Sequence, residues 1–190
     1  MVGVIPVLLF DFVEKNWGKS AVSEIKLQAG MSDDKEFRLD TYYPDEEWRR
    51  IFKATVAVLQ MDSEELETVF ARYCGEDLVI RFAGFLKGVN SARDVITRQP
   101  KIHNFIGSSV QDSEARQAIS DKFRLEEKPD ETIMHYVSPN QLCTFYRGLA
   151  QWVADYFGEK IQIKELHCLK QGAAECEIHV KYLGKKEPRG

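Results

Sequence analysis

Several features that mark common protein classes are missing from the sequence. The apolar run near the N-terminus, residues 2–10, is too short to span a bilayer, and it lacks the basic flank and small-residue cleavage site of a signal peptide. Four cysteines in 190 residues are too few for a disulfide framework and favour a reduced, cytoplasmic setting. Because 26 basic residues stand against 30 acidic ones, neither nucleic acid nor a membrane is expected as a partner.

Motifs of the common enzyme classes are also absent from the sequence. It contains no glycine-rich phosphate loop, no His-Glu-x-x-His and no nucleophile elbow, and its carboxylates form no pairs beyond those of charged helix faces. We therefore do not expect an enzyme. A hydrophobic content of 44% over 190 residues is enough for one domain with a substantial core.

The first hundred residues carry the patterns of helices. An apolar stripe at i, i+3 and i+4 spacing covers residues 4–16, with Pro6 tolerable in the first turn and Gly18 as a stop. A second helix begins at Tyr43-Pro44 with proline in its first turn and acidic residues after it. Other helices are expected at residues 20–29, at 63–74 with a stop near Gly75, and at 76–98, broken near Gly84 or Gly88.

Strand patterns appear only in the second half of the chain. Residues 107–121 are polar and are expected to form a flexible loop. Ser138 as N-cap and Pro139 in the first turn begin a long amphipathic helix that ends at Gly158. Alternating apolar and polar residues predict four strands, at residues 122–127, 132–137, 160–169 and 175–183.

These elements predict an α+β fold in which a four-stranded antiparallel sheet carries the long helix on one face. One domain should cover residues 1–183. We place its helical lobe at about residues 1–75 and its α/β lobe at about 76–183, followed by a charged tail at 184–190.

Three cysteines form the first candidate site. Cys168 and Cys176 flank the last hairpin turn, and Cys143 lies near the start of the long helix, so three thiolates can converge on a tetrahedral zinc ion. Glu165 and His167 are candidates for the fourth ligand. Small apolar thiols that fill the seam between helix and sheet explain the same pattern, and both interpretations remain open. Cys74 is expected to be buried in the helical lobe.

A lone histidine forms the second candidate site. His103 lies between the apolar residues Ile102, Phe105 and Ile106, after a helical segment and before a polar one. Neutral imidazole is a good metal ligand, but a histidine on a half-apolar helix is also a common structural residue. The stretch by itself leaves both roles open.

The order and spacing of several short motifs resemble those of the heme nitric oxide/oxygen binding (H-NOX) domain. This domain is the sensor module of soluble guanylate cyclases and of bacterial signalling proteins, and the resemblance, to the bacterial stand-alone type, covers about residues 1–183. The motifs that carry it are Met1-Val-Gly-Val-Ile5, Tyr43-Pro-Asp-Glu-Glu47, Lys101-Ile-His103, Tyr136-Val-Ser138, Leu142-Cys143, Tyr156-Phe-Gly158 and Cys168…Gly172…Cys176.

The resemblance implies that heme b binds between the lobes with His103 as its proximal ligand. Tyr136, Ser138 and Asn140 match the Tyr-x-Ser-x-Arg motif that holds the heme propionates, with Asn140 in the place of the arginine. Asparagine gives only neutral hydrogen bonds where arginine gives a bidentate ionic clamp, so Arg116 or Arg147 is a candidate substitute. The proline that the family places against the heme is missing from residues 112–120, which implies a flatter heme.

The resemblance also implies which residues cover the distal face of the heme. They are Ile5, Leu9, Leu78 or Val79, and Phe145. Oxygen-binding members of the family have a tyrosine at the position of Phe145, and phenylalanine cannot donate a hydrogen bond to dioxygen. The neighbouring Tyr146 is expected to point elsewhere. Selection of nitric oxide over oxygen follows from these positions.

A sensor of this kind signals to a separate partner, such as a histidine kinase, a cyclic-di-nucleotide enzyme or a chemoreceptor. Some bacterial members carry a cysteine site for zinc or redox sensing, and Cys143, Cys168 and Cys176 fall at the matching positions. The alternative is a heme-free small-ligand or zinc/thiol redox module on the same fold. Asn140, the missing proline and a kink at Pro100, three residues before His103, favour that alternative.

Overall fold

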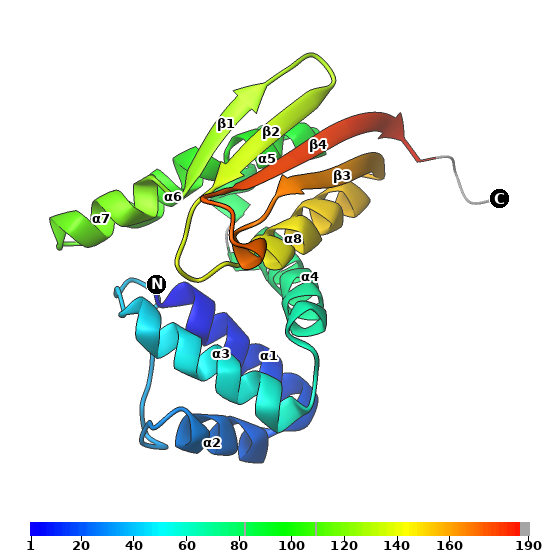
Figure 1. Cartoon of the computed structure of the whole chain (residues 1–190). Helices are drawn as coiled ribbons and strands as arrows, with labels where there is room; N and C mark the ends of the chain where they lie inside the picture. Colours follow the sequence, from blue (N-terminus) through cyan, green and yellow to red (C-terminus); the bar gives the residue numbers. More distant parts are fainter. Residues whose placement is uncertain (82, 109, 187–190) are drawn as a thin grey trace.

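The computed structural model describes residues 1–81, 83–108 and 110–186, without the side chain of Leu78. Four helices come first: α1 (Val4–Trp17), α2 (Lys19–Gln28), α3 (Asp45–Leu59) and α4 (Ser63–Arg81). Helices α1, α2 and α3 form the lower lobe in Figure 1, and α4 rises from it towards the sheet. No helix within the described residues is both long and apolar enough to cross a bilayer.

The helical lobe follows the expected patterns with small differences at helix ends. Helix α1 has Pro6 in its first turn and ends at Gly18, whose φ of 84° suits glycine. Pro44 is the N-cap residue of α3 and lies one position outside the first turn that we predicted for it. The core of this lobe joins Leu9, Phe70 and other buried side chains, among them Val13, Ile25, Trp48, Ile51 and Leu66.

Helix α4 is longer than its sequence pattern predicts. Asp62 caps its start, since its Oδ1 accepts a hydrogen bond of 2.8 Å from the Glu64 N–H. The predicted stop near Gly75 is wrong, because the helix runs on to Arg81. A Cβ at position 75 would collide with the Trp152 ring, so this glycine provides room for a neighbouring helix rather than a chain reversal. The predicted lobe boundary at residue 75 therefore lies inside a continuous helix.

Short helices connect the lobes. A 3₁₀ turn, Ala83–Leu86, precedes α5 (Ala92–Thr97), α6 (Gln99–Ser108) and α7 (Ser113–Ser120). The expected flexible loop over residues 107–121 is wrong, because Asp112 caps α7 through the Ala115 N–H at 2.7 Å. Pro100 is the second residue of α6 and lies in the first turn, where proline does not kink a helix. The kink that we expected at Pro100, which favoured a heme-free module, is therefore absent from α6.

The predicted four-stranded antiparallel sheet is confirmed. Its strands, β1 (Phe123–Glu127), β2 (Glu131–Tyr136), β3 (Glu159–His167) and β4 (Cys176–Lys185), lie in the order β1-β2-β4-β3. Figure 1 shows α8 (Cys143–Tyr156) along one face of this sheet. Strand β4 extends two residues beyond the predicted end at Leu183, and residues 187–190 of the predicted tail lie outside the described residues.

The long helix α8 begins later than predicted. Ser138 is not its N-cap; the Ser138 hydroxyl accepts a hydrogen bond of 3.3 Å from the Asn140 N–H and forms a local turn. Gln141 then adopts a left-handed conformation with φ of 49°, which interrupts the chain before the helix can start. Leu142 is the N-cap residue, so Cys143 is the first residue of α8.

Helices α4 and α8 join the two lobes. Besides the contact of Gly75 with Trp152, a Cβ at Gly148 would lie 2.9 Å from the Ala71 Cβ, which shows how closely the two helices approach. Glu67 of α4 is 2% exposed. It accepts hydrogen bonds of 2.9 Å from the Phe145 N–H and 2.6 Å from the Lys170 ammonium group. A buried ion pair therefore supports this part of the interface.

Candidate functional site

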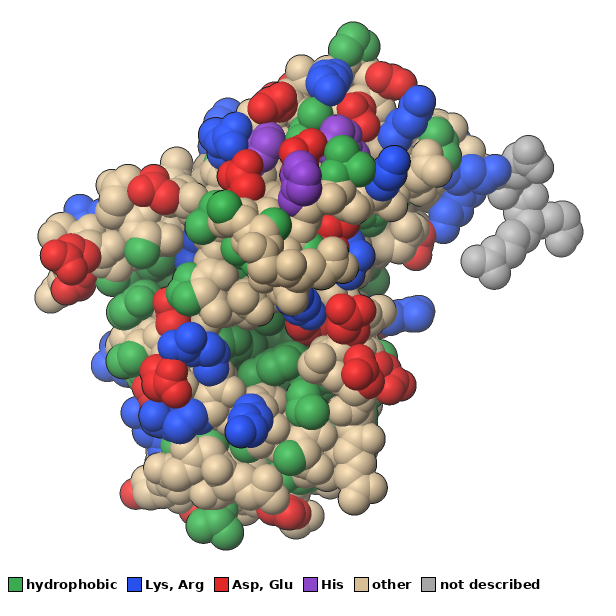
Figure 2. Space-filling view, viewed as in Figure 1, with side chains coloured by type: hydrophobic (Ala, Val, Ile, Leu, Met, Phe, Trp, Pro, Cys, Tyr) green, Lys and Arg blue, Asp and Glu red, His purple; other side chains and the backbone are tan. Residues whose placement is uncertain are grey.

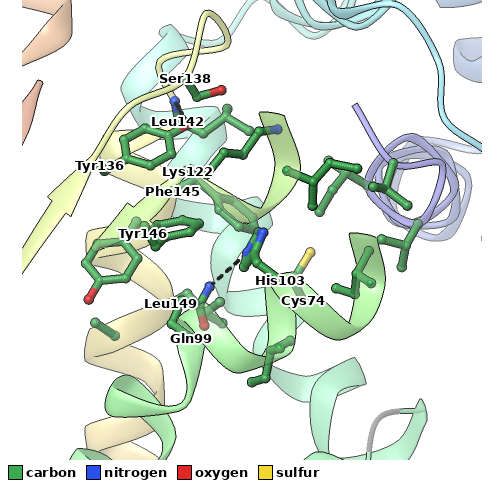
Figure 3. A pocket seen from close by; sticks show the side chains of 18 of the residues that line it. Cys74, Gln99, His103, Lys122, Tyr136, Ser138, Leu142, Phe145, Tyr146 and Leu149 are labelled. Carbon is green, nitrogen blue, oxygen red and sulfur yellow. Dashed lines mark hydrogen bonds between the residues drawn. The ribbon is translucent and has the colours of Figure 1, made fainter. Parts of the chain in front are cut away.

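An apolar cavity lies between the two lobes, beside the α4–α8 contact. Its walls come from α1, α4, α5, α6, α8 and the start of the sheet. Figure 3 shows the polar side chains of this cavity on a largely apolar lining. Apolar lining residues include Ile5 and Leu8 of α1, Ile102 and Ile106 of α6, and Phe145, Leu149 and Val153 of α8. Such a space suits a large, flat, apolar ligand.

His103 lies on the wall of this cavity, where α6 places it. Its imidazole ring packs 4.5 Å from the centre of the Phe123 ring, and its Nε2 lies 3.3 Å from the Gln99 Nε2. Burial, and then the charge of Lys122, lowers the pKa of His103 to about 3. The imidazole is therefore neutral at physiological pH, and a Gln99 amide that donates to Nε2 occupies the lone pair that a metal would take.

Tyr136 and Ser138 also line the cavity, at the end of β2 and just after it. The Tyr136 hydroxyl accepts a hydrogen bond of 3.1 Å from the Leu142 N–H, and burial raises the pKa of this tyrosine well above its usual value. Both hydroxyls lie on the same side of the cavity in Figure 3. They are available to donate to a carboxylate at this end.

Asn140 does not line the cavity, although its sequence position matches the propionate motif. Its side-chain amide donates a hydrogen bond of 2.7 Å to Asp45, and so ties the loop before α8 to the start of α3. The two predicted substitutes are also occupied elsewhere. Arg116 donates to the Val110 carbonyl at 2.9 and 3.1 Å, and Arg147 lies 3.3 Å from Glu165. Neither arginine is part of the cavity wall.

The residues predicted for the distal face are only partly in the cavity. Ile5 and Phe145 line it. Leu9 does not, because it lies on the face of α1 that packs into the helical core, and Leu8 takes the cavity position instead. The side chain of Leu78 lies outside the described part of the structure, and Val79 is not part of the wall.

Tyr146 lines the cavity as well, contrary to the expectation that it points elsewhere. Its ring lies 5.9 Å from the centre of the Phe123 ring. The hydroxyl is buried and has no hydrogen-bond partner among the described residues. Burial raises the pKa of Tyr146, and the Tyr182 hydroxyl adds to the shift.

The lining residues that the sequence analysis did not assign to the site include Gln99, Cys74 and Lys122. Gln99 lies one helical turn before His103, and this i, i+4 spacing is a signal that the sequence does contain. Cys74 is buried as expected, but its surroundings include the cavity. Nothing in the sequence around Lys122 marks it, because its importance comes from the walls that surround it.

The cysteine cluster is not part of this cavity wall and lies where the start of α8 meets the turn between β3 and β4. Cys143, Cys168, Cys176 and Glu165 place one ligand atom each within 4.8 Å of one another. The Sγ atoms of Cys143 and Cys168 are 3.5 Å apart, and the Leu169 N–H donates to the Cys176 sulfur at 3.2 Å. The Glu165 Oε1 atom is buried without a hydrogen-bond partner among the described residues.

His167 lies outside this group of four. Its side chain is 64% exposed, and its Nδ1 lies 3.2 Å from Glu177 on the outer side of the sheet. The alternation of strand β3 explains the difference, because residues two apart in a strand share a face but the chain shifts register between Glu165 and His167. Glu165 is therefore the candidate for the fourth ligand.

A family model described as Haem-NO-binding matches residues 2–165 of the chain. The chain belongs to the Haem-NO-binding family. Among solved structures, an H-NOX protein from S. oneidensis in the Fe(II)NO state matches with a TM-score of 0.81 and 20% identity, over 97% of this chain and 100% of that one. An oxygen-binding H-NOX domain related to soluble guanylate cyclases matches with a TM-score of 0.74 and 18% identity, over 100% and 99%.

A third match, a Cs H-NOX mutant, has a TM-score of 0.79 and 19% identity, over 98% of this chain and 100% of that one. No protein with a curated description matches the sequence. The structural matches confirm the H-NOX fold, and the family is one of heme-based gas-sensor domains.

The cavity of this chain fits the heme that the family name implies. Its walls are apolar, as the two faces of a porphyrin require, and His103 offers a neutral ring nitrogen from one wall. At the end where Tyr136 and Ser138 lie, the ammonium group of the half-buried Lys122 has no anionic partner among the described residues. A ligand with an apolar body and a negatively charged edge satisfies all of these groups.

Proposed function

We propose that the protein senses nitric oxide at a heme b that His103 ligates. The observation that carries the proposal is the position of His103, a neutral imidazole on the wall of an apolar cavity between the lobes of a Haem-NO-binding chain. When bound, heme supplies the iron to which a diatomic gas binds. The chain itself provides the ligand nitrogen, excludes water and holds the edge of the group.

Phe145 supports selection of nitric oxide over oxygen. Its ring is fixed by the Phe70 ring, 5.3 Å between centres, and by the hydrogen bond of its N–H to Glu67. Phenylalanine has no donor for bound dioxygen, which gains from a hydrogen bond more than nitric oxide does. The aliphatic residues Ile5 and Leu8 add no donor of their own.

Helix α6 provides a route by which a change at His103 reaches the surface. It contacts α7 and strand β1, so a displacement of the imidazole moves elements outside the cavity. We propose that release of His103 shifts α6 against the sheet lobe, and that a separate cytoplasmic signalling protein recognises the shift. A histidine kinase, a cyclic-di-nucleotide enzyme or a chemoreceptor is the kind of partner that we expect.

Absorption spectra of the ferrous protein test this function. We expect a Soret band that changes with nitric oxide and stays unchanged in oxygen. Phe145→Tyr should gain an oxygen complex, because one added hydrogen bond of about 1 kcal/mol slows oxygen release about fivefold. Tyr146→Phe is the matched control, since it removes a phenol hydroxyl that has no hydrogen-bond partner among the described residues at the next position along α8, and it should leave the spectra unchanged.

Two outcomes contradict the proposal in different ways. If the wild-type protein forms an oxygen complex that Tyr146→Phe abolishes, Tyr146 is a distal donor and the protein is not selective for nitric oxide. If the purified protein is colourless and does not take up heme, the alternative of a heme-free ligand-binding or thiol module is favoured.

We propose a second, separate role for the cysteine cluster as a zinc site. Zinc–sulfur bonds of about 2.3 Å in a tetrahedron place sulfur atoms about 3.8 Å apart, close to the separation of 3.5 Å between Cys143 and Cys168. The unpartnered Glu165 Oε1 supplies the fourth ligand atom. The neighbouring thiol of Cys176, together with burial, raises the pKa of Cys143, so a cation is needed to hold this thiol as thiolate.

Metal analysis of the purified protein tests the zinc site. We expect about one zinc ion per chain, lost in Cys143→Ser and retained in Cys74→Ser, whose sulfur lies in the other core. If the wild-type protein contains no zinc even after growth in added zinc, the three thiols either fill the apolar seam between helix and sheet or act as a redox switch.

A further inference from the structure

Lys122 is the only lysine or arginine on the described wall of the cavity between the lobes. It follows α7 and precedes β1, and the Val137 N–H donates a hydrogen bond of 3.0 Å to its carbonyl oxygen. This bond places Lys122 beside the chain segment that carries Tyr136 and Ser138. Figure 3 shows its ammonium group on the same side of His103 as those two hydroxyls.

The Lys122 ammonium group has no hydrogen-bond or ion-pair partner among the described residues. Burial lowers the pKa of Lys122, and the attraction of Asp45 only partly opposes the shift. Asp45 is itself occupied, because its Oδ1 accepts hydrogen bonds of 2.7 Å from both the Met1 nitrogen and the Asn140 amide. Lys122 is half-buried, and a partly desolvated cation without an anionic partner is unfavourable, so this end of the cavity suits a negatively charged group.

The residues that sequence analysis considered for the arginine contact of the family motif do not line the cavity. Asn140 is turned towards Asp45, and Arg116 and Arg147 are bound to a carbonyl and a carboxylate away from the cavity. In contrast, the two hydroxyl members of the motif, Tyr136 and Ser138, keep their positions on the wall. A carboxylate at this end would meet two hydroxyls and the Lys122 ammonium group.

We propose that Lys122 is the residue that binds a heme propionate in this chain, in the place of the arginine that position 140 lacks. The assignment rests on the proposed heme-binding function. Lysine offers a compact charge rather than a planar fork, so the contact supplies charge neutralisation more than geometric fixation. The cation thus lies just before β1, at Lys122, and not in the loop before α8. Asn140, in that loop, instead joins the loop to α3.

The dissociation rate of heme, measured by transfer to a heme-accepting protein, tests the assignment. Lys122→Met should release heme about tenfold faster than the wild-type protein, because one charge-assisted hydrogen bond is lost. Lys122→Arg should release heme at nearly the wild-type rate. Lys101→Met is the matched control, since it removes an exposed lysine of the same region, and it should have no effect.

Heme with both propionates methylated separates a propionate contact from a general loosening of the site. The wild-type protein should release this ester about as fast as Lys122→Met releases either form. The apoprotein gives an independent readout: Lys122→Met should raise its melting temperature slightly, because the substitution removes a half-buried cation that has no partner among the described residues. A residue with only a structural role would lower this temperature.

The outcomes distinguish this assignment from the proposed function. If the wild-type protein binds heme but Lys122→Met changes the release of heme and of its ester by the same factor, the Lys122 assignment is wrong and heme binding stands. If the wild-type protein takes up no heme, the assignment is wrong together with the function on which it rests.

Discussion

The two halves of the interface between the lobes are built in opposite ways. Where α4 meets α8, glycines at positions 75 and 148 bring the helices into close contact, and the buried Glu67 carboxylate is paired with Lys170. Burial lowers the pKa of Lys170, but the Glu67 carboxylate outweighs it and the net shift is upward. This half is filled and its charges are matched.

The other half is hollow and its charge is unmatched. Apolar side chains of α1, α6 and α8 line an open space, and Lys122 faces it without a partner among the described residues. Protein interiors are normally packed to the density of organic crystals, and buried charges are normally paired. The same chain satisfies both rules in the adjoining half of the interface, so the hollow half is explained by a ligand that completes it.

Adding one carbon to the filled half should have the largest effect on stability. Gly75→Ala places a methyl group against the Trp152 ring, and we expect a loss of about 1–3 kcal/mol in the free energy of unfolding. Urea denaturation measures this loss. Gly84→Ala, whose Cβ would meet no atom within 4 Å, is the control and should change stability by less than about 0.5 kcal/mol.

Adding three carbons to the hollow half should lower the free energy of unfolding less than Gly75→Ala does, but it should weaken ligand binding. Ala150 lines the cavity, and Ala150→Leu should reduce the free energy of unfolding of the apoprotein by under about 1 kcal/mol, because the side chain enters open space. Heme uptake should weaken in the same variant. A destabilisation as large as that of Gly75→Ala would show that the two halves are equally filled.

The smallest effect on stability should come from titration of a histidine on the outer face of the sheet. The pKa of that histidine provides a reference for the pKa of His103. Figure 2 shows histidine side chains gathered there with acidic ones. The hydrogen bond to Glu177 raises the pKa of His179, burial opposes it, and Glu131 adds to it. Since the folded-state pKa is raised, this stabilisation is complete below the ordinary value of 6.5 and is lost as pH rises through the higher folded value.

NMR titration of the histidine ring signals checks this contrast. His179 should titrate above 6.5 and return towards that value in Glu177→Gln, whereas His103 of the apoprotein should remain neutral throughout the same range. Titration of both rings at the same pH would mean that the inner and outer surroundings do not differ.

Much of the fold could be predicted because its signals are local. Alternation in β1 and β2 and the glycine turn at Gly172, which brings Cys168 close to Cys176, follow from short stretches of sequence. Helix α7 was missed because its apolar stripe consists of only Ala115 and Ile119 among polar residues. The late start of α8 was missed because the left-handed turn at Gln141 overrides the Ser138-Pro139 signal.

The site was less predictable because its chemistry depends on distant parts of the chain. Asn140 is removed from the cavity by Asp45, a partner 95 residues away in sequence. The role proposed for Lys122 depends on its ammonium group having no such partner within the described part of the chain, and no sequence pattern indicates this. His103, Tyr136 and Ser138 were identifiable only through their resemblance to the family's motifs, and all three line the same cavity in the structure.

The most direct test of this account is the spectrum of His103→Gly with and without free imidazole. We expect the ferrous Soret band of the reconstituted variant to differ from that of the wild-type protein, and added imidazole, which can occupy the vacated space beside Gln99 and Phe123, to restore it. A His103→Gly spectrum identical to that of the wild-type protein before imidazole is added would show that another residue ligates the iron, and would contradict the account.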